Sequence, residues 1–369
     1  MHSYASAIND ANQATGVSDT GFADGAFRFS GVPGSGGVMV NLGSVDARAI
    51  NNGGQVAGLS FGQAVVYSGV PGSGGSLANL GTLGGTSSGA YGINDSGSVV
   101  GTSQTTGDLF NHAFLYNGVP GSGGSMADLG TLGGTYSVAW DISNAGQIVG
   151  QAGLTGDAAG RAFVYSGVPG AGGSMADLGT LGGMNSVGYA INNAGQTAGT
   201  SALTGDTEYH AFLYSGTPGA GGTMVDLGTL GGDYSEAFGI NDAGFVVGYS
   251  RRSTGPEVWP TLWLNDAAHT AIDLAAWLNT TNPAMGADWV LGSSSSRTID
   301  INNNGLIVGT GYYNGPGGNG YAHAFMLDVS TLVPAPSSSV LLAVLGLSGA
   351  VRRRRSAAAT VRETQATTE

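Results

Sequence analysis

Cysteine and lysine are both absent from this sequence of 369 residues. Without cysteine the chain can form no disulfide, no thiolate zinc site and no cysteine nucleophile. All 11 basic residues are arginine, and the part before Arg352 carries 6 of them against 22 acidic residues, a net charge of −16. A body this acidic repels phosphate backbones and anionic lipid surfaces, so nucleic acid is not expected as a partner.

Glycine, by contrast, is abundant, with 69 residues, and hydrophobic residues make up 41% of the chain. The glycines follow no triplet period, which excludes collagen, and the apolar content is sufficient for a core. A glycine-rich chain with a core is typical of many short strands joined by tight turns.

A repeated anchor, Ile-Asn-Asp/Asn-x-Gly-x-x-x-Gly, organises the chain. One copy has Ser143 in place of the first Asn, and another has Asn12 in place of the first Gly. The seven anchors begin at Ile8, Ile50, Ile93, Ile142, Ile191, Ile240 and Ile301, at spacings of 42, 43, 49, 49, 49 and 61 residues. Repeats of 40 to 50 residues are a recognised length for propeller blades.

Each repeat is predicted to form four short strands, which in the fourth repeat span residues 137–142, 147–150, 162–165 and 175–178. Asn-Gly-type and Pro-Gly turns separate these apolar runs, as expected of hairpins. A four-stranded sheet cannot bury both faces alone, so neighbouring sheets must cover one another. The sequence therefore predicts an all-β, seven-bladed propeller of antiparallel blades over residues 1–330.

Within a blade we expect small side chains on the first strand, such as Ser137 and Ala139, to face the crowded axis. The third strand supplies bulk, with phenylalanine at one register position in five repeats: Phe27, Phe114, Phe163, Phe212 and Phe325. The sixth repeat is longer, and a helical turn is expected at residues 274–278.

The two ends of the repeat region do not match the pattern. When the repeats are aligned on their anchors, Met1 falls at the position that directly follows Leu-Gly-Gly in other repeats, so the first repeat lacks that phrase. The last repeat has only a poor fourth strand at residues 329–333. An upstream segment could supply that strand, so we expect the natural N-terminus to lie before Met1. No secretory leader is visible in the first ten residues, which agrees with this expectation.

The C-terminal region has three parts after a linker at residues 331–336. Residues 337–351 are mostly apolar, four arginines follow, and residues 356–369 are expected to be disordered. We predict a short hydrophobic helix over residues 337–355. The positive-inside rule would keep the arginines cytoplasmic and leave the preceding chain on the far side of the membrane.

These residues resemble a PEP-CTERM sorting signal, with Ala335 where such signals usually have Glu. The matching residues are Val333, Pro334 and Pro336 and the cluster Arg352, Arg353, Arg354 and Arg355. The resemblance implies export in a Gram-negative bacterium, transient anchoring in the inner membrane, and processing by an exosortase-type enzyme.

The repeats are similar to the HAF family of extracellular repeats, named for the His-Ala-Phe that begins here at His112, His210 and His323. The similarity runs from about residue 3 to residue 328 and includes the Asp-Leu-Gly-Thr-Leu-Gly-Gly phrase. It implies an extracellular address and no defined activity.

Acidic residues recur in the loop between the second and third strands, as Asp108, Asp157 and Asp206. This loop should share a face with the Thr-Leu-Gly-Gly connectors. An acidic rim there could hold Ca²⁺ or saccharide hydroxyls; the alternative is a turn aspartate that bonds its own backbone.

Asp300, Asn302 and Asn304 match the first half of a calcium-loop pattern, but Gly311 stands where the pattern has a bidentate Glu. No other cofactor is expected. The three histidines should hydrogen-bond at the start of the third strand rather than bind metal.

Two further groups have structural explanations. The aspartates before the Leu-Gly connector are expected to clamp loop N–H groups: Asp128, Asp177, Asp226 and Asp273. The tryptophans are expected to pack in the core, and the alternative is that they form an exposed sugar-binding platform: Trp140, Trp259, Trp263, Trp277 and Trp289.

No nucleophile triad, isolated carboxylate pair or phosphate loop stands out. The sequence therefore favours an exported, non-enzymatic propeller of the cell surface or extracellular matrix that binds polysaccharide or a surface protein through loops on one rim. A secreted polysaccharide hydrolase or lyase and a purely structural surface-layer component are the alternatives.

Overall fold

The computed structural model describes residues 2–19, 24–31, 36–69, 75–119, 122–292, 297–315, 320–332 and 342–345. Strands dominate these residues. The helical segments are short: η1 (Thr106–Asp108), η2 (Thr155–Asp157), α1 (Leu274–Thr281) and α2 (Pro283–Asp288). The chain is thus all-β, as predicted, and α1 begins where a helical turn was expected.

The strands form mostly antiparallel, four-stranded groups, one for each anchor, here called units 1 to 7. Units 1 to 3 contain β1 (Ser3–Ile8), β2 (Gln13–Asp19), β3 (Asp24–Ser30) and β4 (Val38–Gly43); β5 (Asp46–Ile50), β6 (Val56–Ser60), β7 (Gln63–Ser68) and β8 (Ser76–Asn79); and β9 (Gly84–Ile93), β10 (Val99–Thr105), β11 (Asn111–Asn117) and β12 (Ser125–Asp128). Units 4 and 5 contain β13 (Gly133–Ile142), β14 (Ile148–Leu154), β15 (Gly160–Ser166) and β16 (Ser174–Asp177); and β17 (Gly182–Ile191), β18 (Thr197–Leu203), β19 (Tyr209–Ser215) and β20 (Thr223–Asp226). Units 6 and 7 contain β21 (Gly231–Ile240), β22 (Val246–Arg252), β23 (Val258–Trp263) and β24 (Ala271–Asp273); and β25 (Trp289–Val290), β26 (Arg297–Ile301), β27 (Leu306–Tyr313), β28 (Ala322–Asp328) and β29 (Leu342–Leu345).

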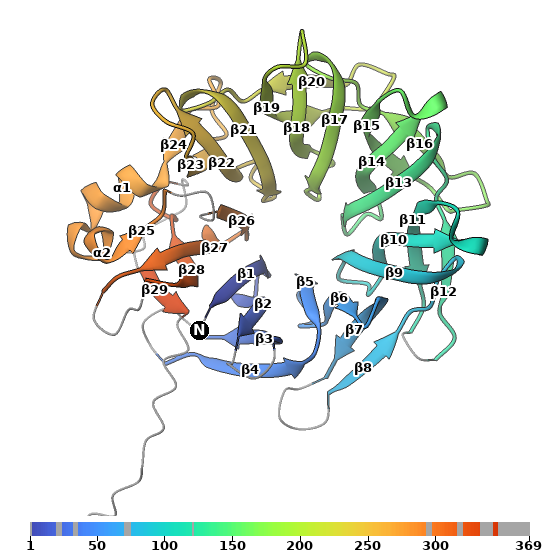
Figure 1. Cartoon of the computed structure of the whole chain (residues 1–369), viewed down its shortest axis with the longest axis horizontal. Coiled ribbons are helices and arrows are strands. Elements are labelled where there is room, and N and C mark those ends of the chain that lie inside the picture. The colour runs from blue at the N-terminus through green and yellow to red at the C-terminus, as the bar shows by residue number, and fades with distance from the viewer. Residues whose placement is uncertain are drawn as a thin grey trace, which may run out of the picture.

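The units stand side by side around a common centre, and the innermost strand is the first one of units 1 to 6 and β26 of unit 7 (Figure 1). Each of these inner strands contacts the inner strand of the next unit, and β26 of unit 7 contacts β1 of unit 1. Units 5 and 6 are also joined by one parallel pair, Tyr209 with Tyr234.

Unit 4 shows how the repeat builds its strands. Its anchor turn is closed by a hydrogen bond from the N–H of Gly146 to the carbonyl of Ser143, and Gly146 has a φ of 80° that favours glycine. The second anchor glycine, Gly150, meets a different demand, because a Cβ there would lie 1.9 Å from the carbonyl oxygen of Val138. The anchor thus requires glycine once for a turn and once for close approach of two strands.

The hydrophobic cores lie between neighbouring units. Val100 and Leu115 of unit 3 pack in one cluster with Ile142, Ile148 and Phe163 of unit 4. The phenylalanine of the third strand is buried in all five repeats that carry it, as predicted. No unit buries its apolar surface alone, which is the packing expected of stacked repeats.

The small side chains of the first strand were placed wrongly by the sequence. Ser137 and Ala139 are fully buried against unit 3, not at the axis. The hydroxyl of Ser137 accepts the N–H of Ala113 at 2.8 Å and donates to the carbonyl of Gly130 at 2.5 Å. The backbone of the neighbouring unit comes closest on this face of β13, and the opposite face, with Trp140, is directed to the centre.

The end of unit 7 also differs from expectation. Residues 329–332 form a turn rather than a fourth strand, and the strand that pairs with β28 is β29, from within the segment predicted to be a helix. An unpaired strand edge leaves N–H and C=O groups without partners, and an extended apolar segment can supply them. Val333, Pro334, Pro336 and the arginine cluster lie outside the described residues.

None of the helices in the described ranges combines the length and the apolar character that a membrane crossing requires.

Candidate functional site

The hairpin connections divide the molecule into two faces. The anchor turns and the Val-Pro-Gly turns lie at one end of the strands, here called the turn face. The loops between second and third strands and the Leu-Gly-Gly connectors lie at the other end, here called the loop face. Contacts support this division, because Asp157 in a loop bonds Thr135, which follows a connector.

The three loop aspartates each hold the backbone of their own unit. Oδ1 of Asp157 accepts the N–H of Thr135 at 2.8 Å, and its Oδ2 accepts the Thr135 hydroxyl at 2.6 Å. These bonds lower the pKa of Asp157. Asp108 and Asp206 make the equivalent bond to the N–H groups of Thr86 and Met184, at 2.7 and 2.6 Å. The carboxylates are thus distributed over units 3, 4 and 5.

Several exposed apolar side chains lie on the loop face. They occupy the connections between second and third strands in units 2, 3 and 7: Phe61, Leu109, Phe110 and Tyr321. Phe61 is 93% exposed and has a φ of 48°, in the two-residue turn between β6 and β7. A bulky residue rarely adopts this left-handed conformation, and here it buries almost nothing in return.

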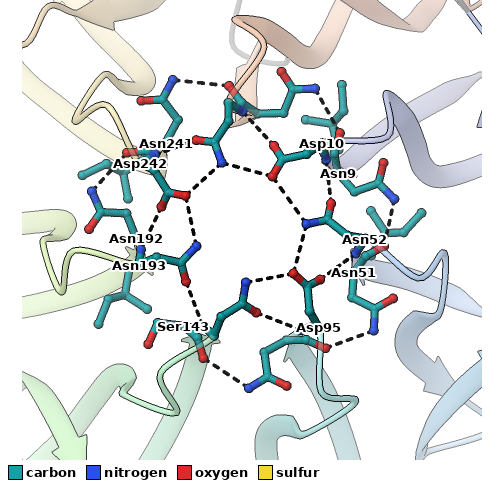
Figure 2. Close-up of a pocket in the computed structure, with 18 of the residues that line it drawn as sticks. Asn9, Asp10, Asn51, Asn52, Asp95, Ser143, Asn192, Asn193, Asn241 and Asp242 are labelled. Atoms are coloured by element: carbon teal, nitrogen blue, oxygen red, sulfur yellow. Dashed lines mark hydrogen bonds between the residues drawn. The ribbon is translucent and has the colours of Figure 1, made fainter.

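Seven side chains on the turn face form a continuous ring around the axis, here called the polar ring (Figure 2). Its members are the third residues of the anchors: Asp10, Asn52, Asp95, Asn144, Asn193, Asp242 and Asn303. The N–H of each member donates to Oδ1 of the member in the next unit at 2.8 to 2.9 Å, and Asn303 donates to Asp10. No two aspartates are neighbours, and Asn amides donate to the carboxylates between them.

A second set of amides lies next to the polar ring, farther from the axis, and links the same units (Figure 2). The Asn of one anchor donates from Nδ2 to the carbonyl oxygen of the corresponding residue in the next unit, as Asn192 does to Asn241 at 3.0 Å. Six of the seven members are Asn: Asn9, Asn51, Asn94, Asn192, Asn241 and Asn302. The seventh is Ser143, which has no amide to donate.

The calcium candidates are engaged in this network. Oδ1 of Asp300 accepts the N–H of Ile301, and its Oδ2 accepts the N–H of Ile8. Oδ1 of Asn302 accepts the N–H of Leu306, and Asn304 donates to the carbonyl of Asp10. Among the described residues no group of three His, Cys, Asp or Glu side chains could hold a metal ion.

Histidine side chains at the start of the third strand hydrogen-bond to the aspartates that hold the Leu-Gly connectors. Nδ1 of His112 lies 2.8 Å from Oδ2 of Asp128, whose Oδ1 accepts the N–H of Gly130. His210 and Asp226 repeat the arrangement at 2.9 Å. The roles predicted for these histidines and aspartates are confirmed in units 3 and 5.

Four tryptophans pack in the protein, as expected. Trp263 and Trp289 are buried, and Trp259 and Trp277 pack against the core of units 6 and 7. Trp140 is different, because it lines a cavity of about 340 Å³ at the centre of the ring of units.

This central cavity was not predicted from the sequence. Its wall is formed by the residues one and two positions before the anchor Ile. A detectable signal was present, because the position two before the anchor is aromatic in four successive repeats: Tyr91, Trp140, Tyr189 and Phe238.

Comparison with known proteins adds little to this geometry. Residues 228–329, which contain the last two anchors, match the model of a family described as a protein of unknown function (DUF3466). None of the curated proteins matches the chain.

Proposed function

We propose that this chain is an exported, non-enzymatic seven-bladed β-propeller of the HAF type that binds extracellular polysaccharide through its loop face. The propeller is supported by the polar ring, whose hydrogen bonds pass through every unit and return from Asn303 to Asp10. A rigid ring of this kind holds several loops in fixed positions on one face, as a multivalent binding surface requires.

The observation that carries the binding proposal is Phe61. Its backbone conformation is unfavourable for a bulky side chain, and the ring is almost fully exposed, so it does little for folding. A contact outside the chain explains its presence. An exposed aromatic face can stack on a sugar ring, and Leu109 and Phe110 of the adjacent unit 3 extend the apolar surface.

The loop aspartates support a binding role rather than hydrolysis. A two-carboxylate mechanism needs a pair of acids roughly 5 to 9.5 Å apart on either side of the scissile bond. Asp108, Asp157 and Asp206 are each bonded to their own unit, which suits loops that are held in shape.

Substitution of Phe61 by Asn tests the proposal. Asn-Gly is a favoured pair in this type of turn, so Phe61→Asn should retain or raise stability while weakening co-sedimentation with extracellular polysaccharide. Val168→Asn is the matched control, since Val168 is equally an exposed apolar residue but lies on the turn face. Equal binding by the wild type and Phe61→Asn would contradict the proposal.

The same preparation separates the alternatives. Release of reducing ends or unsaturated sugars from the polysaccharide would indicate a hydrolase or lyase. Absence of any glycan binding, together with recovery in the matrix fraction, would indicate a structural surface-layer component or a protein partner.

Export rests on the resemblance to a PEP-CTERM signal. A C-terminally tagged chain, directed to the secretory pathway by an added leader in an exosortase-bearing host, should lose its tag. Replacement of Arg352, Arg353, Arg354 and Arg355 by Gly should prevent this processing. Cytoplasmic retention of the intact tagged chain would contradict export.

A further inference from the structure

The central cavity has an aromatic wall on one side. Ring centroids of Tyr91 and Trp140 lie 4.7 Å apart with planes inclined by 33°. Trp140 and Tyr189 are 5.7 Å apart and inclined by 55°, and Tyr189 and Phe238 are 5.1 Å apart and inclined by 44°. The rings therefore curve around a space rather than forming one flat platform.

Two carboxyl groups face the same cavity. Asp141 and Asp300 stand directly before an anchor Ile, where the other five units have Ala or Gly: Ala7, Ala49, Gly92, Ala190 and Gly239. Oδ2 of Asp141 accepts the N–H of Ile191 at 2.9 Å, and Oδ2 of Asp300 accepts the N–H of Ile8 at 3.0 Å. Five units pack with small residues at this position, so the repeat does not require an acid there, and the hydrogen bond to the other unit does not by itself account for a charged group beside the cavity.

No ion pair balances the charge of these acids among the side chains that the structure describes. The ion pairs found there involve neither Asp141 nor Asp300. Burial raises the pKa of both carboxyl groups, that of Asp300 to about 7, and the charge of Asp141 adds a smaller contribution to the latter shift. Each carboxyl oxygen still has a lone pair for another partner.

Arg48 is the basic residue among those that line the cavity, and its charge is already engaged. Its Nη2 lies 2.6 Å from Oδ2 of Asp46, and its guanidinium carbon lies 4.9 Å from the centroid of Tyr91. It closes one side of the cavity without neutralising the two acids.

We propose that the central cavity binds a small organic cation whose ammonium group lies against the aromatic wall and beside Asp141 and Asp300. Aromatic rings that enclose a space attract such cations through their negative faces. The acidic body of the protein favours the approach of a cation, and Asp10, Asp95 and Asp242 of the polar ring add negative charge on the turn face. A neutral sugar could donate hydroxyls to the two acids but would leave their charge uncompensated.

Calorimetric titration of the whole chain with choline tests the proposal, with 3,3-dimethylbutan-1-ol as the neutral molecule of the same shape. Choline should bind and the neutral analogue should not. Trp140→Leu should weaken choline binding about tenfold, the effect of losing one strong cation–π contact. Binding at neutral pH should also release protons, measured in buffers of different ionisation enthalpy, because a nearby cation favours the ionised carboxyl.

Two further variants show whether a loss of choline binding reflects misfolding, and whether it is separate from binding at the loop face. Asp141→Asn with Asp300→Asn preserves a hydrogen-bond acceptor at each site and should weaken choline binding, while circular dichroism confirms the fold. Phe61→Asn, on the loop face, should leave choline binding unchanged whether or not it affects polysaccharide. Any of four results would overturn the proposal. Choline and its neutral analogue could bind equally, or a neutral methyl glycoside could bind better than choline. Neither choline nor ethanolamine could bind at millimolar concentration, or Trp140→Leu could leave choline binding unaffected.

Discussion

Oδ2 of Asp300 accepts the backbone N–H of Ile8 at 3.0 Å and so joins unit 7 to unit 1 across 292 residues of sequence. Asp141 makes the same contact with Ile191, inside the continuous part of the chain. The carboxyl group thus links two units, yet its burial disfavours the ionised form. This combination has a measurable consequence for stability.

Stability should fall as pH rises through neutrality, because of Asp300. Its pKa is about 7 in the folded protein against 3.8 in the unfolded chain, so the folded state holds the proton more tightly. The stabilisation is complete below pH 3.8 and is lost as pH rises through about 7. We expect Tm to decline between pH 5 and 8, and Asp300→Asn to reduce that decline in thermal melts.

Asp157→Asn is the control for this experiment. The pKa of Asp157 is lowered, so its contribution is lost only as pH falls below about 3.8, outside the measured window. If Tm of the Asp300→Asn variant declined with pH as steeply as that of the wild type, Asp300 would not be the cause of the decline.

The second anchor glycine should not tolerate a methyl group. A Cβ on Gly101 would lie 1.9 Å from the carbonyl oxygen of Gly89, so Gly101→Ala must separate β9 from β10. We expect a loss of about 2 kcal/mol or more in the free energy of unfolding, measured in urea.

Gly89→Ala, on the partner strand, is the matched control. A Cβ there meets its nearest atom, the Tyr91 hydroxyl, at 3.4 Å, and units 4 and 5 carry Val138 and Val187 at this position. Stability should be unchanged or raised by about 0.4 to 1 kcal/mol. Equal losses in the two variants would refute the steric explanation.

Ser143→Asn should complete the second set of amides, next to the polar ring. The new Nδ2 would reach the carbonyl of Asn192, as the six existing amides reach theirs, and we expect about 0.5 to 1.5 kcal/mol of stabilisation. Asn192→Ser, which breaks the bond to Asn241, should cost a similar amount. Chemical denaturation measures both, and changes of the same sign would count against the network.

His210 and His323 share a register but should titrate differently. The hydrogen bond to Asp226 raises the pKa of His210 above 6.5, whereas burial lowers that of His323. In unit 7 the strand partner of Phe325 is Val344, where unit 5 pairs Phe212 with Asp226. Proton NMR should resolve the two values on opposite sides of 6.5.

Asp226→Asn should bring the pKa of His210 down and leave His323 unchanged. Because the folded pKa of His210 is raised, its stabilisation is complete below pH 6.5 and is lost as pH rises through the folded value. A His210 pKa that is insensitive to this substitution would contradict the clamp.

Local patterns located the repeated strands and turns, but not β29, which lies in the segment predicted to be a helix. The anchor turns and the Pro-Gly turns follow from spacing and residue type, since each depends on atoms within a few residues. The third-strand phenylalanines were recognised from their repeated register, although side chains of a neighbouring unit help to bury them. The repetition of the loop aspartates and the His112–Asp128 clamp were predictable for the same reason, because their partners lie within one unit.

The tertiary structure alone decided what the centre of the molecule contains. Period-two alternation separates Ser137 from Trp140 onto opposite faces of β13, but only the approach of unit 3 determines which face is covered and which lines the cavity. Likewise, the bond from Asn303 to Asp10 spans 293 residues, and no local pattern specifies the partner of a hydrogen bond that forms only when the units meet. The sequence determined the repeating unit, and the packing of units against one another created the rings and the cavity.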